Sequence, residues 1–194
     1  MSILAFNKLS NLQQRTIVGI SGALLFVFCL YFSEWSYLLL ILALSLLGQI
    51  EFYGLIREDG DDPLTKWGII NGILLNLICF FVARGDLPTK AFFLFFVLLG
   101  VIYISELYRK ASNPFENIAY TMIGVFYVAM PLALLHFASF SNGFFSYQIA
   151  LGCFFLLWAS DTGAYFAGRT LGKNKLFPRI SPNKTWEGLA GGQL

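Results

Sequence analysis

The segment YQIALGCFFLLWASDTGAYF, residues 147–166, decides the class of this protein. Its 20 residues are mostly apolar or small, and a helix of about that length crosses the roughly 30 Å hydrocarbon core of a bilayer. Five apolar stretches precede it, at residues 17–32, 35–50, 67–83, 91–107 and 118–137. The sequence therefore predicts an all-α, polytopic integral membrane protein with about six transmembrane helices.

Composition and charge support the same class. Of the 194 residues, 57% are hydrophobic and 12% are charged, whereas soluble domains average about 25% charged residues. No basic run interleaved with aromatic residues occurs before the C-terminal segment, so nucleic acid is not an expected partner. Cys29, Cys79 and Cys153 all lie in apolar stretches without Cys-x-x-Cys spacing, which favours packing over metal binding or disulfides.

The first two apolar stretches are short for spanning helices. They cross the membrane if Tyr31, Trp35 and Tyr37 lie at its interface; alternatively, they form a shallow hairpin that enters and leaves on one side. Lys8 and Arg15 precede the first stretch, as in a signal peptide, but no small-x-small cleavage site follows. We therefore interpret this stretch as a retained helix.

The basic residues are divided unequally between the connections. With six crossings, Arg84 and Lys90 fall on one side, and the other 11 of the 13 basic residues fall on the opposite side. Because short cytoplasmic connections are enriched in Lys and Arg, both the N-terminus and the C-terminal segment are predicted to be cytoplasmic. The predicted cytoplasmic set is Lys8, Arg15, Arg57, Lys66, Arg109, Lys110, Arg169, Lys173, Lys175, Arg179 and Lys184.

Asp161 is a charged residue within the sixth stretch, about 7 Å from its predicted cytoplasmic end. An ionisable group inside a spanning segment is costly and marks a functional site by default. We expect Asp161 to bind a metal ion or substrate in a wet cavity; pairing with a basic residue is the alternative. Glu51 and Glu106 end two stretches that run in the same direction. They either converge with Asp161 or mark the headgroup boundary, which we favour.

Ser181-Pro-Asn-Lys-Thr-Trp-Glu187 carries a helix-start signal, with Ser as N-cap and Pro at the first helical position. Such a helix would present free backbone N–H groups to an anion. Lys184, one turn into the helix, and Arg179, just before it, would complete a phosphate site. Glu187 would hold either Lys184 or a divalent metal.

Three other segments are less informative. Gly168-Arg-Thr-Leu-Gly-Lys173 lacks the spacing of a phosphate loop, so Arg169 and Lys173 either bind phosphate or only follow the positive-inside bias. The acidic connection at residues 57–63 lacks the spacing of an EF-hand and is predicted to be a hydrated turn. In the fifth stretch, Pro131 is predicted to kink the helix and His136 to pack rather than catalyse.

Three motifs follow one another near the C-terminal end: Ser160-Asp-Thr-Gly-Ala-Tyr-Phe-Ala-Gly168, Gly172-Lys173 and Ser181-Pro-Asn-Lys-Thr-Trp-Glu-Gly188. In residue types, spacing and order they resemble the phosphatidate cytidylyltransferase family, also called CDP-diacylglycerol synthases. The resemblance implies an integral enzyme of the bacterial inner membrane. It would condense CTP with phosphatidic acid to CDP-diacylglycerol and pyrophosphate, using Mg²⁺ or another divalent cation. A homodimer is left open.

The resemblance also implies site residues. Those expected to be catalytic are Asp161, Lys173, Lys184 and Glu187, and those expected to bind substrate are Ser181, Thr185, Arg179 and Arg169. Asp161 is the expected metal ligand. Lys173 and Lys184 would contact phosphates, whereas Asp161 and Glu187 would hold metal or position substrate.

The predicted organisation has four parts: a cytoplasmic N-terminus (1–16), a transmembrane region (17–166), a cytoplasmic motif loop (167–187) and the start of a further membrane helix (188–194). Gly188 and Gly192 suit close helix packing in that last part. The family's C-terminal signature, with Lys-Asp, His-Gly-Gly and Asp-Arg-x-Asp elements, is absent. We therefore expect a truncated chain that is inactive alone. A CTP-dependent polyprenol kinase and a non-catalytic lipid or ion transporter are the alternatives.

Overall fold

The computed structural model describes residues 11–193. Residues 1–10 and 194 lie outside this range, and with them Lys8, most of the predicted N-terminal region and the last residue of the predicted further helix. The chain divides into two compact units, Met1–Tyr147 and Gln148–Leu194. The sequence did not predict this division, because no linker of distinctive composition separates the two.

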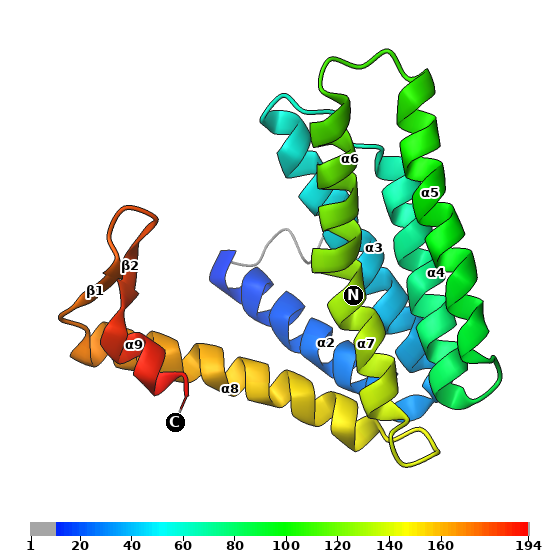
Figure 1. The fold of residues 1–194 in the computed structure, drawn as a ribbon. Helices are drawn as coiled ribbons and strands as arrows, with labels where there is room; N and C mark the ends of the chain where they lie inside the picture. Colours follow the sequence, from blue (N-terminus) through cyan, green and yellow to red (C-terminus); the bar gives the residue numbers. More distant parts are fainter. Residues whose placement is uncertain (1–10, 194) are drawn as a thin grey trace. The chain divides into compact units, whose positions relative to one another are not determined.

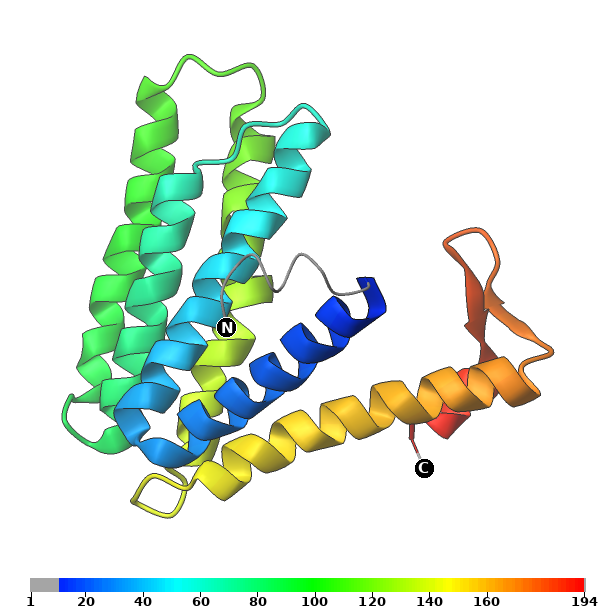
Figure 2. The same ribbon diagram turned by 180° about the vertical axis from the view of Figure 1, so that it is seen from behind.

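The first unit is a helical bundle (Figures 1 and 2). Within it, α4 packs against α3, α5 and α7 and forms the centre of the bundle. The core is apolar and includes Leu75, Ile78, Phe95, Leu99 and Ile102. In chain order the elements are α2 (Asn11–Phe32), α3 (Glu34–Glu58), α4 (Thr65–Arg84), η1 (Thr89–Ala91), α5 (Phe92–Tyr108), α6 (Pro114–Ile123), η2 (Gly124–Ala129) and α7 (Met130–Ser139).

The prediction of six spanning helices is confirmed by length and composition. Six helical segments of 20 to 26 residues are apolar enough to cross a membrane. The first two helices have 22 and 25 residues, which removes the reason for the shallow-hairpin alternative. They are longer than their apolar stretches because their helical turns continue through polar end residues. The helix α3, for example, ends at Glu58, two residues before Gly60 adopts a φ of 100°.

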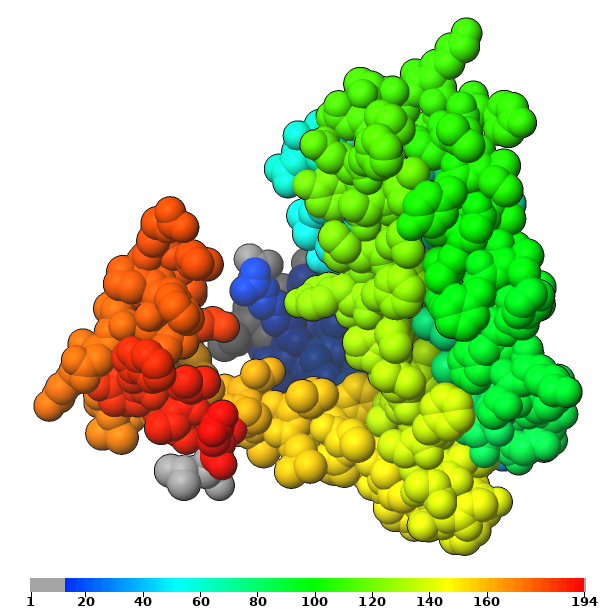
Figure 3. All heavy atoms as spheres, viewed as in Figure 1, coloured from blue at the N-terminus to red at the C-terminus, as the bar shows by residue number. Residues whose placement is uncertain are grey.

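The outer face of the bundle is apolar. Along α5, the green surface of Figure 3, large side chains stand exposed. A surface of this kind is compatible with lipid rather than water. The exposed large hydrophobic residues of α5 are Phe93, Leu94, Phe96, Val97, Tyr103, Ile104, Leu107 and Tyr108.

Polar side chains, in contrast, point into the bundle. The hydroxyl of Tyr53 donates a hydrogen bond to the carbonyl of Thr121 (2.8 Å), and Gln49 Nε2 donates one to the carbonyl of Gly68 (3.1 Å). A Cβ atom at Gly68 or Gly124 would overlap the Tyr53 ring, so these glycines make room for it. Interhelical hydrogen bonds of this kind hold helices together where lipid supplies no hydrophobic drive.

The fifth span does not break at Pro131. The π-helical segment η2 precedes it, and the N–H of Met130 reaches back to the carbonyl of Val125. A wider turn of this kind accommodates a residue that cannot donate a backbone hydrogen bond. Further along, His136 is fully buried and meets the edges of Tyr37 and Phe80, with ring centroids 5.2 and 5.5 Å apart, as its predicted packing role requires.

The second unit consists of α8 (Tyr147–Leu171), which begins at the last residue of the first unit, followed by β1 (Lys175–Phe177), β2 (Ser181–Thr185) and α9 (Trp186–Gly191). Two predicted boundaries are wrong. Residues 167–171 belong to the helix and not to a loop, because Thr170 and its neighbours continue the helical turns beyond Phe166. The motif 181–187 forms a strand before it forms a helix.

Candidate functional site

One face of α8 carries Asp161, Tyr165 and Arg169, which are spaced four residues apart and therefore lie one above another. Arg169 Nη1 donates a hydrogen bond to the Tyr165 hydroxyl at 2.8 Å. The helix α8 continues to Leu171, so Asp161 lies ten residues, or about 15 Å, from the helix end.

A short hairpin follows α8. The strands β1 and β2 pair in antiparallel orientation, with Lys175 opposite Thr185 and Phe177 opposite Ser181, and an irregularity between these pairs. The turn closes with a hydrogen bond from the Ile180 N–H to the Phe177 carbonyl (3.1 Å). Pro178, the second residue of this four-residue turn, has the fixed φ that the position favours.

The predicted helix start at Ser181 and Pro182 is wrong. Ser181 begins β2, and the helix α9 begins five residues later, at Trp186. The Thr185 hydroxyl caps this helix by accepting a hydrogen bond from the Gly188 N–H (3.2 Å). Pro182 is compatible with a strand here because an edge strand leaves one side of its backbone unpaired. Lys184 therefore projects from a strand and not from the first turn of a helix.

Small residues bring α9 close to α8. A Cβ atom at Gly163 would overlap the carbonyl oxygen of Gly191, and one at Gly191 would overlap Ala167. The Ser160 hydroxyl donates a hydrogen bond to the Gly192 carbonyl at 2.7 Å. Close packing at Gly188 and Gly192, as predicted, is confirmed, because a Cβ atom there would lie 3.0 Å from the carbonyl oxygens of Ala164 and Ser160, respectively. These contacts hold α9 against α8.

Glu187 fastens the loop between α8 and β1. Its carboxylate accepts hydrogen bonds from the Asn174 side chain (2.8 Å) and from the Asn174 backbone N–H (3.2 Å). A bond from its own backbone N–H is the main cause that lowers the pKa of the Glu187 carboxyl. Partial removal from water opposes this effect, whereas the Asn174 side chain and the backbone of Lys173 and Asn174 add to it.

These elements enclose a pocket of about 750 Å³ within the second unit. Asp161 supplies its carboxylate, and positive charge comes from Arg169 on the helix and Lys184 on the strand. A pocket of this size holds a nucleotide-sized ligand. The residues that line it are Asp161, Ala164, Tyr165, Gly168, Arg169, Leu176, Ser181, Asn183, Lys184, Thr185, Gly188 and Leu189.

The pocket unites most of the predicted site residues. It brings together Asp161, Arg169, Ser181, Lys184 and Thr185. Lys173, Arg179 and Glu187 are not among its lining residues: Lys173 follows α8, Arg179 lies in the hairpin turn, and Glu187 binds the loop at Asn174.

Among the lining residues with polar side chains, two were missed. Tyr165 lies four residues from both Asp161 and Arg169, so helical periodicity alone could have found it. Asn183 lies two residues from both Ser181 and Thr185, so the three share one face of β2, a pattern that the assumption of a helix concealed.

Glu51 and Glu106 belong to the first unit, and they differ from each other. Glu51 is exposed, in keeping with a boundary residue. Glu106, in contrast, is buried within the bundle. Its carboxylate accepts a hydrogen bond from Asn117 Nδ2 (2.8 Å) and pairs with Arg109 (3.4 Å), so the cost of burial is offset by a charged partner and a polar one.

The residues of the pocket fit a metal ion that is shared with a ligand. Within residues 11–193, no group of three or more His, Cys, Asp or Glu side chains gathers to enclose a cation. Asp161 is the single carboxylate among the pocket's lining residues. Magnesium commonly takes one or two protein carboxylates and completes its shell with phosphate oxygens and water, which is compatible with this arrangement.

The comparisons with known proteins agree on one family. The "Cytidylyltransferase family" matches residues 13–194. The phosphatidate cytidylyltransferase of Bacillus subtilis (strain 168) is 30% identical over 191 residues, which cover 94% of this chain and 67% of the relative. Its namesake from Staphylococcus haemolyticus is 30% identical over 184 residues, covering 94% and 68%. That of Rickettsia bellii is 40% identical over 101 residues, covering 52% and 43%. No solved structure matches the chain.

The helices and the pocket together define a polytopic membrane enzyme whose charged site adjoins an apolar span. With the matches above, the assignment becomes specific. The chain belongs to the cytidylyltransferase family.

Proposed function

We propose that this protein is a phosphatidate cytidylyltransferase, which condenses CTP with phosphatidic acid to give CDP-diacylglycerol and pyrophosphate. The observation that carries the proposal is the pocket of the second unit, where Asp161, Arg169 and Lys184 face one cavity beside a membrane span. A lipid phosphate at the membrane surface and a nucleotide from water can meet at such a boundary. The bacterial relatives and the charge asymmetry support a location in the inner membrane with this pocket on the cytoplasmic side.

The charges of the pocket suit the reaction. An oxygen of the lipid phosphate attacks the α-phosphorus of CTP, the bond from that phosphorus to the bridging oxygen breaks, and pyrophosphate leaves. Arg169 and Lys184 bind the phosphates and hold the two anions together despite their repulsion. The hydroxyls of Ser181 and Thr185 line the same wall and donate hydrogen bonds to phosphate oxygens, although Thr185 also caps α9.

Asp161 would hold a divalent cation, which neutralises charge on the phosphates when it is bound. Glu187 has a positioning role in this proposal. It keeps the loop at Asn174 attached to the first turn of α9 and so fixes the strand that carries Lys184. Lys173 and Arg179 lie outside the pocket lining, and we assign to them the attraction of anions towards the site.

The decisive experiment uses membranes that contain the full reading frame, phosphatidic acid, Mg²⁺ and CTP labelled separately at the α and γ phosphates. The proposal expects the α label in lipid and release of pyrophosphate. If a polyprenol acquires only the γ label, the protein is a lipid kinase and the proposal is wrong. Absence of both labels from lipid also overturns it and directs attention to transport.

Matched variants test the pocket. Asp161→Asn should reduce turnover roughly 100-fold or more, because one electrostatic contact in an active site is typically worth that much. Asp59→Asn, at the exposed C-cap of α3, is its control and should leave turnover unchanged. Lys184→Gln should raise the KM for CTP, whereas Lys175→Gln, on the other strand of the hairpin and outside the pocket lining, should not. If Asp161→Asn and Asp59→Asn reduce turnover equally, the role assigned to Asp161 is wrong. If Lys184→Gln and Lys175→Gln change the KM for CTP equally, the role assigned to Lys184 is wrong.

A further inference from the structure

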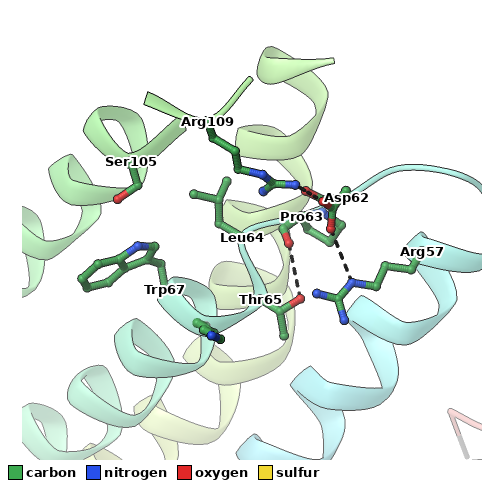
Figure 4. Close-up of a pocket in the computed structure, with 9 residues that line it drawn as sticks. Arg57, Asp62, Pro63, Leu64, Thr65, Trp67, Ser105 and Arg109 are labelled. Carbon is green, nitrogen blue, oxygen red and sulfur yellow. Dashed lines mark hydrogen bonds and ion pairs between the residues drawn. The ribbon is translucent and has the colours of Figure 1, made fainter. Parts of the chain in front are cut away.

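A second charged pocket lies in the first unit, where the α3–α4 and α5–α6 connections meet at the same end of the bundle (Figures 1 and 4). It has a volume of about 380 Å³ and is lined by Arg57, Lys66 and Arg109, together with Asp62, Thr65, Trp67 and others. The proposed reaction uses none of these residues. Three cations around one cavity indicate an anionic ligand.

Asp62 already places an anion among these cations. Its carboxylate pairs with Arg57 (3.6 Å) and with Arg109, as the dashed lines in Figure 4 show. The Asp62 side chain is 64% exposed, so its charge gains little from burial and can be replaced by that of a ligand. Arg109 also pairs with the buried carboxylate of Glu106, and this ion pair remains when Asp62 is displaced.

The backbone around Asp62 is held in part by contacts that do not involve its carboxylate. The Asp62 N–H donates a hydrogen bond to Asn117 Oδ1 (3.0 Å), and its carbonyl accepts one from Arg109 (2.7 Å). Two residues further on, the Leu64 N–H donates to the Thr121 hydroxyl (2.8 Å). The connection therefore stays in place when the carboxylate swings away, and the pocket is preformed.

The helix α4 adds a further attraction for anions. It starts at Thr65, and its N-cap, Leu64, supplies no side-chain acceptor to the first turn. The first two residues of this 20-residue helix, Thr65 and Lys66, line the pocket, so the positive end of its dipole lies beside the cavity. Arginines beside a helix N-terminus recognise phosphate with paired hydrogen bonds.

We propose that this pocket is a second anion site, in which a phosphate group displaces the Asp62 carboxylate from Arg57 and Arg109. The ligand is phosphate-bearing, either a free phosphate or the headgroup of an anionic lipid. Lys66, on the first turn of α4, supplies the third positive charge. Asp62 acts as an internal competitor that keeps the site closed at low ligand concentration.

The test uses 5-fluorotryptophan in the full chain, reconstituted in phosphatidylcholine nanodiscs. Of the four tryptophans, Trp67 lines this pocket and Trp186 lies in the second unit, so their ¹⁹F resonances separate the two sites. Trp67→Phe assigns the reporter. Inorganic phosphate is titrated at constant ionic strength, and nanodiscs with added phosphatidylglycerol form the second arm. A saturable shift of the Trp67 resonance is expected in at least one arm, and the responding arm identifies the source.

Two substitutions give opposite expectations. Arg57→Gln should weaken binding roughly tenfold, the effect of one charge-assisted contact, while Asp62→Asn should strengthen binding by a similar factor because the competitor is lost. Lys90→Gln, in η1 outside the pocket lining, should leave the midpoint unchanged. The proposal is wrong if neither phosphate nor anionic lipid shifts the Trp67 resonance, or if Asp62→Asn weakens binding as Arg57→Gln does.

Discussion

The contact between α8 and α9 predicts that Gly163→Ala detaches α9 from α8. The added methyl group would overlap the carbonyl oxygen of Gly191, a backbone atom that cannot rotate away. Overpacking of this kind costs about 1–3 kcal/mol, which lowers the population of docked α9 by a factor of roughly 5 to 150. Because the Ser160 to Gly192 hydrogen bond depends on the same approach, it is lost as well.

Gly152→Ala is the matched control on the same helix, since a Cβ atom there has no heavy atom within 4 Å. Both substitutions make the same chemical change, and Ala favours helix over Gly by about 1 kcal/mol in each. Hydrogen exchange measured by mass spectrometry should show faster exchange of residues 186–193 in Gly163→Ala alone. Incorporation of the α label from CTP into lipid should fall in parallel. Equal protection of α9 in the two variants would refute the packing argument.

Three further predictions concern single residues. The pKa of Glu187 lies below its ordinary value of about 4.5, so its ionised carboxylate and its bonds to Asn174 stabilise the loop above pH 4.5. This stabilisation is lost as the pH falls and the carboxylate is protonated. Amide exchange in the loop, followed between pH 6 and roughly 3, should become faster. Tyr53→Phe removes one buried hydrogen bond to Thr121 and should cost about 1 kcal/mol in denaturant unfolding in detergent. Gly85→Ala places a side chain at a φ of 90° and should lower the unfolding free energy by about 1–2 kcal/mol in the same assay.

The spans could be predicted from the sequence because each consists of a long apolar run, and the membrane imposes a length on it. The pocket residues could be predicted because motif and charge coincide at Asp161, Arg169 and Lys184. The strand at Ser181 could not, because Ser-Pro is a local signal for a helix start. Here that signal is overridden by pairing with β1 and by the cap at Thr185.

The burial of Glu106 was hidden for a different reason. A glutamate that ends an apolar run resembles a boundary residue, and only its partner distinguishes the two cases. That partner, Asn117, comes from the next helix, and the residue pattern within either helix does not predict the hydrogen bond between Glu106 and Asn117. The second pocket is similar, because Arg57 and Arg109 are far apart in the chain and meet only through the connection at Asp62.

The polar groups shared by α3 and α4 constrain how the protein enters a membrane. Asn76 of α4 bonds Ser45 of α3 (3.2 Å), and Gln49 of α3 bonds the backbone of α4 at Gly68 (3.1 Å). A single helix released into lipid would expose these amides to hydrocarbon, which costs several kcal/mol. The two helices should therefore leave the insertion channel together, as a preassembled pair. The α3–α4 connection would then be complete before α5 is synthesised, so that biogenesis proceeds in hairpins rather than in single spans.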